Sequence, residues 1–85
     1  MKKATDDARS YLKTLAGTYK AAGNLNVRNG AGTGKSIMVT IPSGTKVECY
    51  GYYTTVFSVK WLYVQFTYKN TQYTGFCSSN WLTKL

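Results

Sequence analysis

The sequence predicts a mainly β protein, a small barrel of short antiparallel strands preceded by a short N-terminal helix. From residue 17 onward, short runs of apolar and β-branched residues alternate with turn residues, as in small sandwiches and barrels. The chain has only 85 residues, which is one domain with a thin core. Its content of 44% hydrophobic and 15% aromatic residues favours a compact fold over disorder.

Residues 5–15 are predicted to form the helix. Thr5 can cap its first turn, and the carboxylates of Asp6 and Asp7 suit the positive end of the helix dipole. Apolar side chains recur on one helical face, at Ala8, Tyr11, Leu12 and Leu15. Because so short a helix is marginal in water, residues 1–16 are expected to be a linker or docking segment that packs on the barrel, on a second copy or on an upstream domain.

Seven strands are predicted between glycine-, proline- and asparagine-containing turns. Their ranges are Gly17–Ala21, Leu25–Arg28, Ser36–Ile41, Lys46–Tyr53, Trp61–Tyr68, Tyr73–Cys77 and Trp81–Lys84. In the fifth strand, Leu62, Val64 and Phe66 alternate with Trp61 and Tyr63. A small barrel can bury only the first set, so Trp61 and Tyr63 are expected to line a surface groove.

The stretch "GAGTGKS" at residues 30–36 is similar to a nucleotide phosphate loop, but it fails two requirements. Asn29 stands where the first glycine of that motif is needed, and the β-branched run 37–41 follows where a helix should begin. The loop is therefore expected to be a glycine-rich turn between strands.

Catalysis by this chain is not expected. There is no histidine, and the only acids are Asp6, Asp7 and Glu48, which form no pair suited to acid–base or glycosidase chemistry. Cys49 and Cys77 lack an imidazole to activate them and are expected to be buried free thiols. Two cysteines without histidine cannot complete a zinc site. The sequence thus predicts no catalytic residue, no metal and no cofactor, and places any catalytic domain elsewhere in a longer protein.

Charge and hydropathy limit the partners and the location. Eleven basic residues against three acids give a net charge of +8, which attracts polyanions. No apolar stretch approaches the roughly 20 residues of a membrane span, and no hydrophobic segment of a signal peptide follows Met1. The expectation is a chain made in the cytoplasm, with no signal peptide of its own and no membrane partner.

Four motifs occur in order within residues 17–85 and resemble the bacterial SH3-like (SH3b) domains, the wall-binding modules of phage and bacterial peptidoglycan hydrolases (endolysins). They are Leu25–Thr33 for L-N-V-R-x-G-x-G-T, Ile41–Val47 for L-x-x-G-T-x-V, Trp61–Val64 for W-x-x-V and Gly75–Leu82 for G-W-V-x-x-x-Y-L. Phe76, Cys77 and Trp81 replace the usual Trp, Val and Tyr but keep apolar or aromatic character. The segment Tyr52–Lys60 is unusually long and aromatic for this pattern.

The resemblance implies an SH3-like barrel that binds the wall of a Gram-positive host and targets a catalytic domain of the same lysin to it. The protein would act at the wall after release or as part of a secreted protein. The wall component stays open among the peptidoglycan stem peptide or cross-bridge, the glycan and teichoic acid. Because Met1 opens the predicted amphipathic helix, it is also a candidate internal start for a separate subunit that associates through this helix.

The resemblance implies a set of ligand-binding residues: Asn26, Arg28, Asn29, Trp61, Tyr63 and Trp81. The aromatic pattern alone adds Tyr52. Arg28 can pair with a carboxylate or phosphate of the ligand, or it can brace the loop by bonding its carbonyls. The rings can instead all fill the core. The main alternative function is binding of single-stranded nucleic acid on a basic, aromatic-rich barrel, and proline-peptide recognition is a third.

Overall fold

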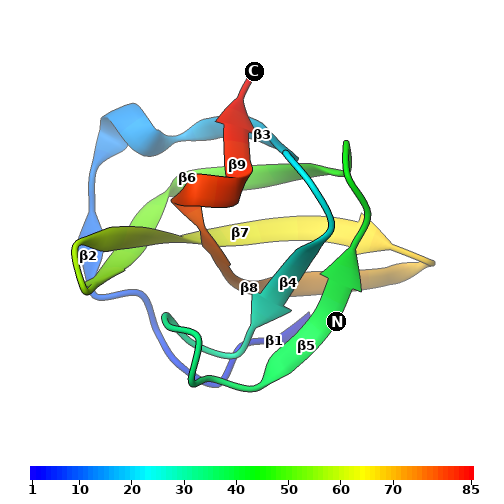
Figure 1. Ribbon diagram of the computed structural model, residues 1–85, viewed down its shortest axis with the longest axis horizontal. Coiled ribbons are helices and arrows are strands. Elements are labelled where there is room, and N and C mark those ends of the chain that lie inside the picture. The colour runs from blue at the N-terminus through cyan, green and yellow to red at the C-terminus, as the bar shows by residue number, and fades with distance from the viewer.

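The computed structural model describes residues 1–85, and 59% of them lie in β-strands. The elements, in chain order, are β1 (Lys2–Lys3), β2 (Ser10–Tyr11), the 3-10 turn η1 (Lys13–Leu15), β3 (Gly17–Ala21), β4 (Leu25–Arg28), β5 (Ile37–Ile41), β6 (Lys46–Val56), β7 (Val59–Tyr68), β8 (Thr71–Ser78), the 3-10 turn η2 (Ser79–Trp81) and β9 (Leu82–Lys84) (Figure 1). No helix is long and apolar enough to cross a membrane.

The strands form one open sheet in the order β5-β4-β8-β7-β6-β3-β9, with β1 added beside β8 and β2 beside β6. Every pairing is antiparallel except that of β1 with β8. The mainly β, antiparallel prediction is confirmed, but the barrel is not closed. The outer strands β5 and β9 do not pair, and β4 meets β8 only where Arg28 lies opposite Phe76.

The predicted strands correspond to β3 through β9, and the largest differences are in β6 and β7. These two strands extend to a hairpin in which Val56 pairs with Val59. Phe57 and Ser58 form its two-residue turn with φ angles of 48° and 66°. The long aromatic segment between residues 52 and 60 is therefore mostly strand, because cross-strand pairing continues up to the turn.

The predicted N-terminal helix is wrong. Residues 1–16 are extended apart from η1, and they pair with the sheet through β1 and β2. The Ala4 amide donates to the Thr74 carbonyl (2.7 Å), and the Leu12 amide donates to the Gly51 carbonyl (2.9 Å). A short isolated helix has little intrinsic stability, and here the extended chain gains sheet pairing and buries Ala4.

Two groups of buried side chains form the core. The larger one includes Val27, Ile41, Val47, Leu62 and Val64. Both cysteines, Cys49 and Cys77, belong to it as buried free thiols, as predicted.

The smaller group consists of Ala4, Trp61 and Phe76. It lies on the face of β7 that was expected to be exposed, and the N-terminal segment covers it. Trp61 is consequently only 6% exposed, and Tyr63 is half-buried against the same group. The expectation that one face of this strand would be open therefore fails in part.

Candidate functional site

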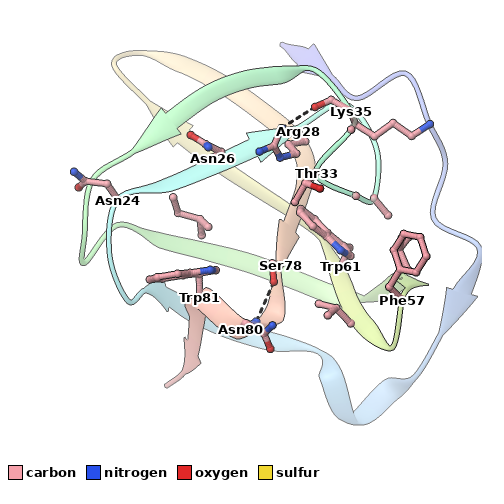
Figure 2. Close-up of a pocket in the computed structure, with 16 residues that line it drawn as sticks. Asn24, Asn26, Arg28, Thr33, Lys35, Phe57, Trp61, Ser78, Asn80 and Trp81 are labelled. Carbon is pink, nitrogen blue, oxygen red and sulfur yellow. Dashed lines mark hydrogen bonds between the residues drawn. The ribbon is translucent and has the colours of Figure 1, made fainter.

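A groove with a volume of about 800 Å³ opens beside β4. The glycine-rich loop at residues 31–35, the β6–β7 hairpin and the β8–η2 segment complete its lining. Figure 2 shows the residues that line it. Its aromatic lining is Phe57, Trp61 and Trp81, and its polar lining is Asn24, Asn26, Arg28, Thr33, Lys35, Ser78 and Asn80.

The three aromatic residues differ greatly in exposure. Trp61 contributes a buried wall, Trp81 is 53% exposed, and Phe57 is 97% exposed. In Figure 2, Trp81 and Phe57 lie toward opposite ends of the groove and Trp61 lies between them. The groove thus offers ring surface along its length, with the most accessible rings at the two ends.

Trp81 is held in place by its own short element. The Trp81 carbonyl accepts a hydrogen bond from the Ala22 amide (2.9 Å), which ties η2 to the turn after β3. The Ser78 hydroxyl accepts from the Asn80 amide (3.3 Å) and caps η2. A Cβ on Gly23 would lie 3.5 Å from the Trp81 ring, so the ring packs directly over this glycine.

Arg28 braces the glycine-rich loop. Its Nη1 donates to the Lys35 carbonyl (2.8 Å), and the neighbouring Asn29 donates through Nδ2 to the Ser36 hydroxyl (2.8 Å). The hydrogen bond from Arg28 to the Lys35 carbonyl is the loop-bracing role that the sequence analysis gave as one of two alternatives for Arg28. A guanidinium has five N–H donors, so the remaining donors of Arg28 are available to a ligand in the groove.

The charged lining of the groove is entirely basic. It consists of Arg28 and Lys35, and no carboxylate lines it. Lys35 is paired through Nζ with Asp6 (3.0 Å) on the N-terminal segment, which fastens that segment to the loop. Glu48 lies elsewhere, on β6, where its carboxylate accepts from the Thr18 hydroxyl. The groove therefore attracts anionic or neutral ligands in preference to cations.

The predicted site residues divide into two sets. Asn26, Arg28, Trp61 and Trp81 all line the groove, although they come from three separate parts of the chain. The Asn26 side chain also accepts from the Thr40 hydroxyl (2.8 Å), so part of its hydrogen-bonding capacity serves the β4–β5 pair.

The other three predicted residues do not line the groove. Asn29 is engaged within the loop through Ser36. Tyr52 lies on β6 against Tyr11, with ring centroids 5.0 Å apart, because β2 pairs there. Tyr63 packs on Phe76 (4.8 Å), and its hydroxyl is buried without a hydrogen-bond partner. Burial, and secondarily the charge of Asp7, raise the pKa of Tyr63.

Several lining residues escaped the sequence analysis, notably Phe57 with its neighbours Val56 and Val59. The hairpin was missed because Phe57-Ser58 lacks the Asn-Gly or Asp-Gly signature of a two-residue turn. One feature of the sequence could have predicted this hairpin. The aromatic and β-branched run that begins at Tyr50 is longer than a single short strand followed by a loop requires. Asn24 and Asn80 were also missed, because isolated asparagines in turns carry no pattern.

A second, smaller cavity of about 570 Å³ also borders the glycine-rich loop and shares Ala31, Lys35 and Val56 with the lining of the groove. It is lined by residues 5–9 together with Ala31, Lys35, Thr54 and Val56. No group of three or more His, Cys, Asp or Glu side chains is placed to hold a metal ion.

Comparison of the chain with protein-family models, with characterised proteins and with solved structures finds no match.

Proposed function

We propose that this chain is a non-catalytic SH3-like (SH3b) module that binds bacterial cell wall and targets a lytic enzyme to it. The observation that carries the proposal is the convergence of three sequence motifs on one groove. Asn26, Arg28 and residues 31–33 of the glycine-rich loop belong to the first motif, Trp61 to the third, and Trp81 to the last. The meeting of three separate motifs at one groove supports a shared role in ligand binding.

The groove has the size and chemistry of a ligand site. Its volume of about 800 Å³ falls within the range of small-ligand pockets, and its lining combines three aromatic rings with polar side chains. Peptidoglycan presents units that combine apolar faces with amide and hydroxyl edges, which suit such a lining. The net charge of +8 adds attraction to the anionic polymers of a Gram-positive wall.

Weak binding of this kind is useful when it is linked to catalysis. A catalytic domain joined to a wall-binding module encounters its bonds at a raised effective concentration. The partner in this proposal is therefore the catalytic domain of a lysin, present in the same longer protein or associated with it.

The alternative is binding of single-stranded nucleic acid, and the observation that favours it is the combination of net charge and exposed rings. The groove itself holds only two basic residues, and one of these, Lys35, is paired with Asp6. A path for a phosphate backbone needs more basic side chains along it, so the wall ligand fits the groove better.

Sedimentation with purified sacculi tests the proposal. The protein is mixed with native sacculi and with sacculi stripped of teichoic acid, and single-stranded DNA is added as a competitor. We expect the protein to pellet with sacculi and to resist displacement by DNA at physiological salt. Failure to pellet, together with tight and salt-sensitive DNA binding, would favour the alternative function.

A further inference from the structure

Phe57 is placed where protein stability alone would not place a phenylalanine. Its side chain is 97% exposed, and its backbone has a φ of 48° at the first position of a two-residue hairpin turn. Asn, Asp or Gly normally occupies that position, because a Cβ is strained in the left-handed region. A bulky apolar residue there combines backbone strain with an exposed apolar surface, and such strain is concentrated at functional sites.

A second hairpin in the same chain provides an internal comparison. The β7–β8 turn has the same backbone pattern, with φ angles of 50° at Lys69 and 64° at Asn70. That turn uses polar residues, and it is not part of the groove lining. The phenylalanine therefore distinguishes the hairpin that borders the groove from the hairpin that does not.

The position of Phe57 adds a second accessible ring to the groove. It stands at the end opposite Trp81, with the buried Trp61 between them (Figure 2). Two exposed rings at separate ends suit an elongated ligand with more than one flat apolar face, since a small single-ring ligand cannot cover both.

The polar lining indicates which elongated ligand this is. Three carboxamides, those of Asn24, Asn26 and Asn80, line the groove. The Asn24 oxygen accepts from the Ser43 amide (3.3 Å) and the Asn26 oxygen from the Thr40 hydroxyl (2.8 Å), so these two offer mainly their N–H donors, whereas the Asn80 carboxamide offers both a donor and an acceptor. Hydroxyl and acetamido groups of amino sugars are neutral donors and acceptors of the same kind. A free peptide amine would need a carboxylate, and none lines the groove.

We propose that the groove binds the glycan strand of the wall, as an extended oligomer of N-acetylated amino sugars, and that Phe57 and Trp81 stack on two different sugar rings. This inference rests on the proposed wall-binding function. It goes further in naming the sugar chain, and not the stem peptide, as the bound component and in assigning Phe57 as a ligand-contacting residue.

The test is a titration of the intact protein with N-acetylglucosamine oligomers from one to six units, and with a soluble stem peptide, followed by tryptophan fluorescence. Because two rings need two sugars, affinity is expected to rise with oligomer length. The variant Phe57→Asn removes the ring and supplies the residue that the turn prefers. It is expected to bind long oligomers about tenfold more weakly and to melt at the same temperature or higher.

Lys69→Asn is the matched control, because it makes the same backbone correction in the hairpin outside the groove. It should leave binding unchanged. Parent-like binding by Phe57→Asn, an affinity independent of oligomer length, or binding of the stem peptide alone would overturn the inference. Sacculi separate the two levels of the account: pelleting without oligosaccharide binding refutes only the glycan inference, whereas failure of the parent protein to pellet refutes wall binding itself.

Discussion

The thiol of Cys77 is expected to limit the stability of the fold at alkaline pH. Cys77 lies on β8 opposite Leu62 with no exposed surface, and burial raises the pKa of its thiol from 9.0 to about 12. A buried thiol loses its proton reluctantly, because the thiolate would have no water to solvate it. The unfolded chain releases the same proton at an ordinary pKa.

The sign and size of the effect follow from this difference. Below about pH 9 both states hold the proton, so the contribution of Cys77 to stability is constant. Between about pH 9 and about pH 12 only the unfolded state loses it, and the free energy of unfolding falls by about 1.4 kcal/mol per pH unit. Over the roughly three pH units between the two pKa values, the free energy of unfolding falls by about 4 kcal/mol in total. This loss is a large part of the roughly 5–15 kcal/mol that stabilises a typical domain.

Urea unfolding at several pH values between about 7 and 11 measures this dependence on the parent and on Cys77→Ala. The variant removes buried volume, which lowers its stability by a similar amount at every pH. Its free energy of unfolding should nevertheless fall less steeply above about pH 9, so that the gap between the two proteins narrows. Burial also raises the pKa of Cys49, Tyr19 and Tyr63, so some alkaline loss remains in the variant. Parallel curves across the range would refute the reasoning.

Two further predictions concern the packing beside the groove. Tyr63→Phe removes a buried hydroxyl that has no partner, so the free energy of unfolding should stay equal or rise by about 1 kcal/mol, with sacculus binding unchanged. Urea unfolding and sedimentation with sacculi measure these two quantities. A loss of wall binding would show that the Tyr63 hydroxyl takes part in ligand binding and would contradict its placement outside the groove. Gly75→Ala places a Cβ 2.6 Å from the Val27 side chain and 3.2 Å from the Arg28 carbonyl, so overpacking should cost about 1–3 kcal/mol. A Gly75→Ala variant as stable as the parent in the same urea assay would contradict the close approach of β8 to β4.

The strands were predictable because their signals are local. Leu25–Arg28 alternates cleanly and ends at a glycine-rich turn, and β5 is a β-branched run that Pro42 ends. The N-terminal segment was mispredicted because its apolar spacing fits a helix, whereas its stability comes from contacts distant in sequence. The Ala4 amide donates to the Thr74 carbonyl, and the Ala4 side chain is buried against Phe76. Nothing within residues 1–16 indicates that these β8 residues are their partners.

The candidate site shows the same division. The ordered motifs nominated Arg28, Trp61 and Trp81, and these three residues do line one groove, because the pairing of the strands brings separate motifs together. Tyr52 was assigned to the site from the aromatic pattern, and Tyr63 from the motif resemblance together with alternation. Alternation gives the face of a strand and not what covers that face. The N-terminal segment covers or contacts both, through Ala4 and Tyr11.

The most direct test of the central claim compares two ring deletions on the surface of the same protein. Trp81 lines the groove and Tyr52 lies outside it, and the two side chains are similarly exposed, 53% and 48%. In a sacculus-binding isotherm, Trp81→Ala should bind at least about tenfold more weakly, because exposed tryptophans at a binding site carry much of its energy, whereas Tyr52→Ala should bind like the parent. Equal binding by the parent and Trp81→Ala, or a larger loss in Tyr52→Ala, would contradict the assignment of wall binding to this groove.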